Sequence, residues 1–89
     1  MTNLTFDHIS ALASFLAECT EPDPAAELKK QELYDSWTKW SRERRIPQVS
    51  MMDFMRQVAV NAPTAKSDSY EKDGSKCFVY RGLKLKRGA

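Results

Sequence analysis

The spacing of hydrophobic positions along this chain predicts three helices followed by a β-hairpin. Five apolar positions near the N-terminus recur at the spacing of one helix face: Ile9, Leu12, Ala13, Leu16 and Cys19. Thr5 or Asp7 supplies an N-cap for this first helix. The segment Glu21-Pro22-Asp23-Pro24 ends it, because proline removes a backbone donor and restricts the backbone.

A long second helix is predicted from Pro24 to about Arg44. Asp23 is a favoured N-cap residue, and Pro24 suits the first helical position. The expected apolar face contains Leu33, Trp37 and Trp40, with Leu28 and Tyr34 beside them. Pro47 stops this helix. The Arg44-Arg45 end suits the negative end of the helix dipole, which gives these arginines a structural role before any ligand is considered.

A turn at Ile46-Pro47-Gln48 separates this helix from a short third helix, predicted from Ser50 to Val60. Ser50-Met51-Met52-Asp53 resembles a capping box, with Asp in place of the more favourable Glu. The apolar face of the third helix consists of four residues: Met51, Phe54, Met55 and Val58. The segment Asn61-Ala62-Pro63 ends it.

A basic hairpin pattern runs from Lys66 to Arg87 around Asp73-Gly74, a strong signal for a two-residue hairpin turn. Ser67 to Lys72 is a polar strand, and Cys77-Phe78-Val79-Tyr80 begins a denser one. Phe78 and Tyr80 share one face of that second strand, whereas Leu83 and Leu85 share the other. This change of parity predicts a bulge at Gly82.

These elements predict an α+β fold of the winged helix-turn-helix class, with three helices followed by a C-terminal β-hairpin wing. A chain of 89 residues forms one small domain, residues 1–89, with a modest core. Ten residues are expected to supply most of that core: Leu12, Leu16, Leu33, Trp37, Trp40, Phe54, Val58, Phe78, Leu83 and Leu85.

Charge is distributed unevenly along the chain. Residues 1–35 hold two Lys and seven acidic residues, giving −5, whereas residues 36–89 hold twelve Lys or Arg and five acidic residues, giving +7. A positive face concentrates a polyanion near it, and this face coincides with the predicted helix-turn-helix and hairpin. A solvated charged face is the alternative.

The residues needed for an enzyme site are scarce. His8 is the only histidine, no phosphate-binding or dinucleotide glycine motif is present, and the acidic residues are scattered. Cys19 and Cys77 form no metal-ligand pattern and are expected to be buried thiols, with a disulfide as the less favoured alternative. We therefore expect no catalytic residue, no metal and no cofactor. No membrane span or leader is recognised, which favours a cytoplasmic protein.

Duplex DNA is the partner that the basic half of the chain suggests. The outward face of the third helix and the turn before it offer five base-facing candidates: Gln48, Ser50, Asp53, Arg56 and Gln57. Eight residues are expected to face phosphates: Arg42, Arg44, Arg45, Lys66, Lys72, Lys76, Arg81 and Lys84. Lys86 and Arg87 add charge at the end of the hairpin.

Four stretches carry a resemblance to a known family: Phe15-Leu16-Ala17-Glu18-Cys19-Thr20, Glu32-Leu33-Tyr34-Asp35-Ser36-Trp37-Thr38-Lys39-Trp40, Pro47-Gln48-Val49-Ser50-Met51-Met52-Asp53-Phe54 and Tyr80-Arg81-Gly82-Leu83-Lys84-Leu85. In their order and spacing they resemble the C-terminal winged-helix domain of phage and plasmid primase-helicases, the group of satellite-phage alpha replication proteins and poxvirus-type primase-helicases. The resemblance extends from about His8 to Arg87. It implies that the domain binds origin DNA and places a helicase there.

The expected function is therefore a non-catalytic module that recognises replication-origin duplex DNA in a bacterial host cell. Primase and helicase motifs are absent from these residues, so the resemblance implies an excised domain or a stand-alone relative. A winged-helix transcriptional regulator is one alternative. Another is a protein-interaction module that docks a helicase or a regulator through the exposed Met52 and the acidic face between Pro24 and Asp35. A homodimer is compatible with repeated origin elements.

Overall fold

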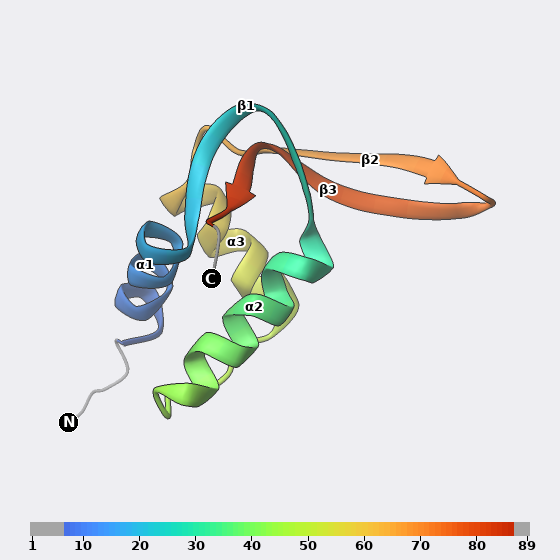
Figure 1. Cartoon of the computed structure of the whole chain (residues 1–89). Coiled ribbons are helices and arrows are strands. Elements are labelled where there is room, and N and C mark those ends of the chain that lie inside the picture. The colour runs from blue at the N-terminus through green and yellow to red at the C-terminus, as the bar shows by residue number, and fades with distance from the viewer. Residues whose placement is uncertain (1–6, 87–89) are drawn as a thin grey trace.

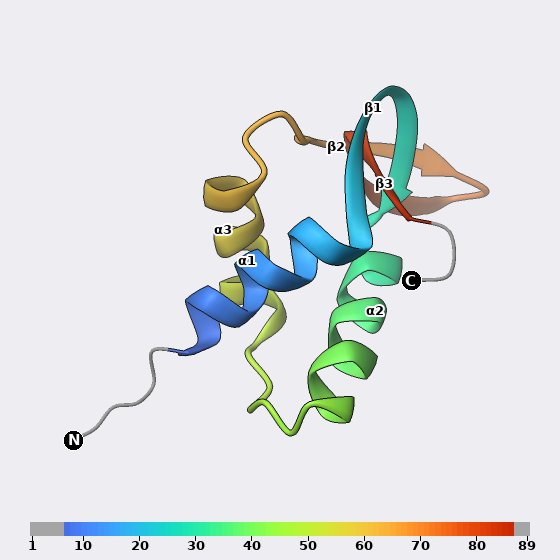
Figure 2. The same ribbon diagram turned by 60° about the vertical axis from the view of Figure 1, so that its left-hand side comes forward.

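The computed structural model describes residues 7–86, with side chains from residue 10 onward. Three helices lie on one side of a three-stranded antiparallel sheet, from which two strands project as a wing (Figures 1 and 2). The elements follow in the order α1 (Asp7–Cys19), β1 (Thr20–Lys29), α2 (Lys30–Glu43), α3 (Met51–Asn61), β2 (Lys66–Lys72) and β3 (Ser75–Leu85). This α+β arrangement, with two successive helices followed by a C-terminal strand pair, confirms the predicted fold class.

The first correction concerns β1, because residues 24–29 form part of a strand and not the start of the second helix. Asp23 makes a local bond typical of a turn: its Oδ1 accepts the Ala25 N–H at 3.0 Å. The backbone then pairs with β3, and the Leu28 side chain enters the core. Sheet pairing satisfies the backbone groups that a helix would otherwise satisfy. Tertiary contacts therefore override the local helix-start signal.

The predicted irregularity at Gly82 is present, but the extra residues belong to the partner strand. The β1–β3 register passes from Pro22 opposite Leu83 to Glu27 opposite Arg81, so four residues of β1 face Gly82 alone. Gly82 has a φ of +88°, and a Cβ there would lie 3.0 Å from the Thr64 carbonyl oxygen. Only glycine fits this position without strain.

The parity change on β3 is confirmed by the core. Tyr80 and Leu83 are three residues apart, yet both are buried in the same hydrophobic cluster. At the far end of the wing, Asp73 and Gly74 have φ values of 52° and 79°, and Lys72 pairs with Ser75. This is the predicted two-residue hairpin turn, with the two positive φ angles of a type I′ turn.

The third helix begins as predicted. The Ser50 hydroxyl accepts the Asp53 backbone N–H at 3.1 Å, which confirms Ser50 as the N-cap. The second half of a capping box is not formed, because the Asp53 carboxylate contacts Arg56. Phe54 and Val58 are buried against the other helices, and the flanking methionines of the apolar face are half-buried.

An aromatic cluster forms the centre of the core. The ring of Phe15 lies 5.7 Å from Trp37 and 5.6 Å from Trp40 in edge-on contacts, and Phe54 lies 6.1 Å from Trp37. Eight of the ten predicted core residues are buried: Leu12, Leu16, Leu33, Trp37, Trp40, Phe54, Val58 and Leu83. The core prediction omitted five buried hydrophobic residues: Phe15, Cys19, Leu28, Val79 and Tyr80.

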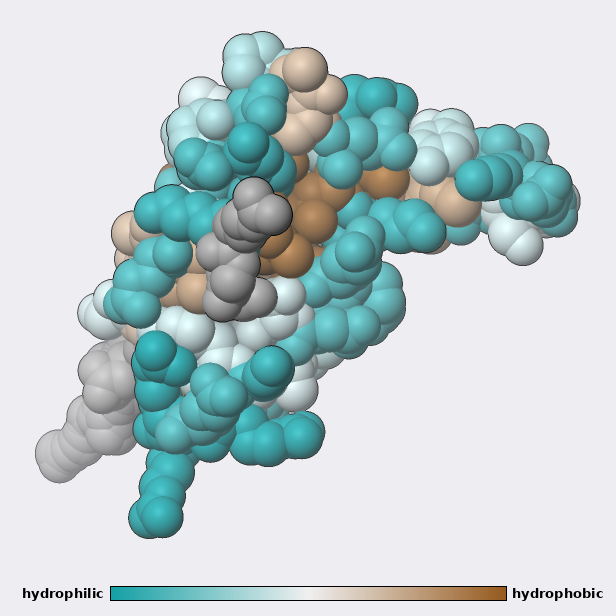
Figure 3. Space-filling view, in the orientation of Figure 1, coloured by the Kyte–Doolittle hydropathy of each residue, from teal (hydrophilic) through white to brown (hydrophobic). Residues whose placement is uncertain are grey.

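Two core predictions are corrected. Leu85 is half-buried at the edge of the cluster, and Phe78 is 53% exposed because β3 extends beyond the helices into the wing. The space-filling view shows the same division: hydrophobic surface is concentrated in the middle of the face, and hydrophilic surface covers most of the wing (Figure 3).

Candidate nucleic-acid interface

The exposed face of α3 carries both polar and apolar side chains. Arg56 and Asp53 are exposed, with the Arg56 Nη1 3.2 Å from the Asp53 Oδ1, and Gln57 is half-buried. Met52 and Val60 are 71% and 69% exposed beside them. An exposed ion pair of this kind contributes at most about 1 kcal/mol, so Arg56 can leave Asp53 for a stronger partner. The helix thus presents one arginine that is available for a guanine edge.

Two base-facing candidates make local contacts in this structure. Gln48 donates from Nε2 to the Ser41 hydroxyl at 2.6 Å, and Ser41 is buried in α2. The Ser50 hydroxyl is used by the N-cap bond. Both side chains therefore hold the turn between α2 and α3, and a base contact by Gln48 would require this hydrogen bond to break.

The three arginines after Trp40 lie at the end of α2 opposite the wing (Figure 1). Arg44 donates from Nη1 to the Trp40 carbonyl at 3.1 Å, and its guanidinium lies 4.1 Å from the Trp40 ring centroid. It also lies 3.8 Å from the Glu18 carboxylate. These contacts hold the Arg44 side chain against the end of α2. Arg42 and Arg45 are exposed.

Arg81 and Lys84 lie on β3 beside acidic residues of its two neighbouring strands. Arg81 contacts Glu27 at 2.9 Å and Asp68 at 2.6 Å, and thereby links the three strands. Lys84 Nζ lies 3.3 Å from Asp23 and 3.8 Å from Glu21. These two basic residues, predicted to face phosphates, thus have carboxylate partners in the folded chain.

Hydrogen bonds along these strands shift the pKa values of three side chains. Hydrogen bonding from Arg81 lowers the pKa of the Asp68 carboxyl. The pKa of Asp23 is lowered first by the Ala25 N–H and then by Lys84. The Tyr70 hydroxyl donates to Glu27 at 3.0 Å, and this bond raises the pKa of Tyr70. The acidic first half and the basic second half of the chain therefore neutralise each other along the β1–β3 pair.

The remaining wing lysines form no ion pair among the described residues, although Glu71 lies opposite Lys76 in the β2–β3 register. Lys66, Lys72 and Lys76 are exposed, and no ion pair within residues 10–86 involves them. Lys66 and Lys72 begin and end β2, and Lys76 follows on β3. Of the predicted phosphate-facing residues, these three offer the most accessible positive charge on the wing.

A groove of about 650 Å³ joins the wing to the N-terminal ends of α2 and α3. Its lining consists of Lys29, Lys30, Gln31, Met51, Met55, Lys76, Cys77 and Phe78. Lys30 donates to the Ser67 hydroxyl and lies 4.9 Å from the Tyr80 ring centroid. The sequence reasoning missed Lys29 and Lys30 as binding residues because it placed them inside a longer helix. If the sequence had predicted a strand that ends at Lys29, both lysines would have been expected where α2 begins.

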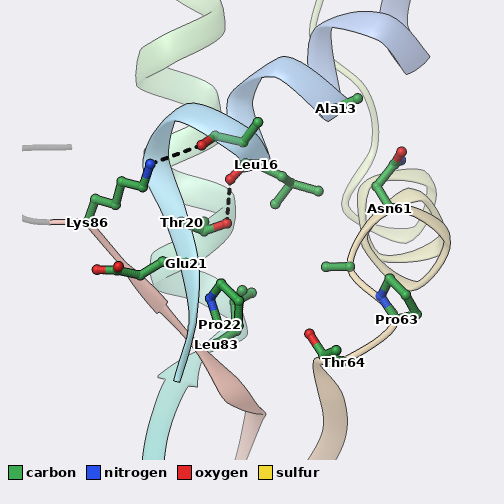
Figure 4. Close-up of a pocket in the computed structure, with 12 residues that line it drawn as sticks. Ala13, Leu16, Thr20, Glu21, Pro22, Asn61, Pro63, Thr64, Leu83 and Lys86 are labelled. Atoms are coloured by element: carbon green, nitrogen blue, oxygen red, sulfur yellow. Dashed lines mark hydrogen bonds between the residues drawn. The ribbon is translucent and has the colours of Figure 1, made fainter. Parts of the chain in front are cut away.

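A second pocket, of about 510 Å³, lies between the ends of α1, α3 and β3 (Figure 4). The Thr20 hydroxyl donates to the Leu16 carbonyl at 2.6 Å, and the Lys86 ammonium donates to the Ala17 carbonyl at 3.1 Å. Asn61 likewise donates to the Gln57 carbonyl at 2.9 Å. These polar groups bind the chain's own backbone, so they brace the elements around the pocket.

The two cysteines were also considered in the sequence as reactive or metal-binding side chains. Cys19 and Cys77 are free thiols. Cys19 is buried as predicted, and burial raises its pKa, whereas Cys77 on the wing is only half-buried, which corrects the prediction for that residue. No group of three His, Cys, Asp or Glu residues within residues 7–86 is placed to hold a metal ion. The Thr5 cap, the side chains of Asp7, His8 and Ile9, and Arg87 lie outside what the structure describes.

Comparison of the chain with protein-family models and with curated proteins finds no match. The similarity to primase-helicase domains therefore remains an expectation based on the four stretches quoted above. None of the helices within residues 7–86 is both long and apolar enough to cross a membrane.

Proposed function

We propose that this chain is a non-catalytic module that binds duplex DNA, with α3 in the major groove and the wing along the adjacent backbone. The observation that carries the proposal is the position of Lys66, Lys72 and Lys76, which are exposed on the wing without acidic partners in the described chain. Lys76 shares a groove with the first residues of α3, so the wing charge and this helix border the same surface.

The dimensions and chemistry of α3 suit this role. Its 11 residues span roughly 16 Å, and an α-helix fits within the major groove. The N-terminal end of a helix carries partial positive charge, which favours a nearby phosphate. In this proposal Arg56 would bind a guanine edge and Gln57 an adenine, and each such pair would add roughly 1–3 kcal/mol of discrimination.

Replication-origin DNA is the target that we propose, on the resemblance to primase-helicase C-terminal domains. Helicase or primase domains of the same protein would then be its functional partners. A transcriptional regulator of this fold would use the same surface on a promoter. Footprinting across the surrounding genome separates the two, because it identifies protection at an origin or upstream of a gene.

A mobility-shift salt series with duplex DNA tests the proposal. The combined variant Lys66→Ala, Lys72→Ala, Lys76→Ala should weaken binding and reduce the slope of log affinity against log salt by roughly 2–3, since each lost phosphate contact removes about 0.9. Lys39→Ala, an exposed lysine on α2, is the control for a surface charge outside the interface. Absence of a shift by the wild-type chain at low salt would refute DNA binding, and an unchanged slope in the triple variant would refute the wing contact.

A further inference from the structure

Phe78 is a large apolar side chain that lies exposed on the wing. It occupies β3 opposite Ser69 of β2, and 53% of its surface is accessible. Its side chain lines the groove together with Met51 and Met55 from α3. The groove therefore has an apolar floor built from two elements that are distant in sequence.

The rim of this groove has the opposite character. Lys29 and Lys30 at the start of α2 and Lys76 on the wing contribute ammonium groups. Lys30 is partly occupied by Ser67 and the Tyr80 ring, whereas Lys29 and Lys76 have no ion pair within the described residues. None of the eight residues that line the groove is acidic. The surface thus combines an apolar floor with a cationic border.

We infer that this groove binds an acidic amphipathic peptide segment of a partner protein. A Phe or Leu side chain of the segment would pack on Phe78, Met51 and Met55, and flanking carboxylates would meet Lys29 and Lys76. Methionine side chains adapt their shape to apolar ligands, which suits a floor of this composition. A volume of about 650 Å³ lies in the range of protein pockets that bind drug-sized ligands, roughly 300–1,000 Å³.

The composition of the floor favours a peptide over a nucleic acid. Surfaces that bind single strands stack successive bases on several aromatic rings, and Phe78 is the one aromatic residue in this lining. A duplex presents mainly phosphates and base edges, which leave an apolar floor without a matching group. An acidic amphipathic segment supplies both the apolar side chain and the negative charge.

Peptide binding would affect DNA binding through Lys76. This lysine is part of the groove rim and also one of the three wing lysines proposed to contact phosphates. A bound acidic segment would occupy the ammonium group and repel the DNA backbone. This competition rests on the proposed DNA-binding function, whereas peptide binding itself does not.

The test uses fluorescence anisotropy with a short labelled synthetic peptide in which Asp and Glu flank one Phe and two Leu. Wild-type protein should bind this probe, and Phe78→Ala should bind it roughly tenfold more weakly or worse, as expected for loss of a central aromatic contact. Phe78 is exposed, so this variant should fold, and its circular dichroism melt checks that it does. Val60→Ala, an exposed apolar residue of α3 outside the groove lining, is the matched control and should bind normally.

Four further measurements separate the outcomes. The same peptide with its Phe and Leu replaced by Ser should bind weakly, and Lys29→Ala with Lys76→Ala should reduce probe binding most at low salt. No binding by wild type, or equal binding by Phe78→Ala, would overturn the proposal. Oligothymidylate that binds more tightly than the peptide and depends on Phe78 would replace it with a base-stacking site. Duplex binding that is retained by Phe78→Ala, but displaced from wild type by the peptide, would support competition between peptide and DNA at Lys76.

Discussion

Arg45 adopts a backbone conformation that an arginine side chain disfavours. Its φ is 56°, at the position after the α2 C-cap where glycine is usual. The Ile46 N–H reaches the Ser41 carbonyl at 2.9 Å and the Arg45 N–H reaches Arg42 at 3.1 Å, the bond pair of a Schellman motif. These hydrogen bonds hold Arg45 in the left-handed region, which costs a non-glycine residue roughly 1 kcal/mol.

We therefore expect Arg45→Gly to raise the free energy of unfolding by about 1 kcal/mol, measured by urea denaturation. Arg45→Ala removes the same charge but keeps the Cβ, so it should give little or no stabilisation. Equal stabilisation by both variants would attribute the effect to charge at the end of the helix and not to the backbone.

At the scale of elements, Arg81 links the wing to β1. Its guanidinium contacts Glu27 of β1 and Asp68 of β2, and the pKa of Asp68 lies below its ordinary value of 3.8. A carboxyl whose pKa is lower in the folded state stabilises the fold above the unfolded pKa. That contribution is lost as the pH falls through the folded pKa. Acidification from neutral pH to below about pH 4 should therefore weaken the fold.

Asp68→Asn should reduce this loss of stability between pH 7 and pH 3, as measured by urea denaturation at each pH. Asp23 also has a lowered pKa, so part of the pH dependence should remain. The control is Glu71→Gln, which removes an exposed carboxylate of the same strand that forms no ion pair within the described residues. A pH profile of Asp68→Asn identical to that of the wild type would contradict the assignment.

The sequence predicted elements whose signals are local and missed those that depend on distant pairing. Ser50 caps α3 and Asp73-Gly74 closes the hairpin as expected, because a cap or a tight turn is specified within a few neighbouring residues. β1 was missed because Asp23 and Pro24 imitate a helix start, and only the pairing with β3 decides otherwise. The lysines at the groove were missed for the same reason, since their position follows from where β1 ends.

The sequence pattern also failed to predict which side chains of β3 are buried. Phe78 and Tyr80 share a strand face, yet Tyr80 is buried in the hydrophobic cluster and Phe78 is 53% exposed beside the first residues of α2 and α3. Phe is the more hydrophobic of the two residue types, so hydropathy alone would predict the opposite order of burial. The distinction depends on how far the helices extend beneath the wing, which is a property of the whole fold.

At the scale of the whole molecule, the linear division of charge is reduced by folding. Negative residues of the first half lie beside basic residues of the second along β1 and β3, as in the contacts of Lys84 with Asp23 and Glu21. The chain keeps a net charge of +2, so accessible positive charge depends on which basic groups lack partners. Acidic residues of β1 should therefore limit the attraction of DNA to the adjacent part of β3.

We expect Glu21→Gln combined with Asp23→Asn to tighten duplex binding several-fold at low salt, because the change releases Lys84 and raises the net positive charge. Asn at position 23 keeps an oxygen for the Ala25 N–H, and exposed ion pairs contribute at most about 1 kcal/mol, so the fold should change little. The gain should shrink as salt screens it, as measured by mobility shift. The control is Glu32→Gln with Asp35→Asn, which makes the same change in net charge without releasing a basic residue from an ion pair of the described chain. An equal gain in affinity from this control would show that total charge, and not Lys84, sets the affinity.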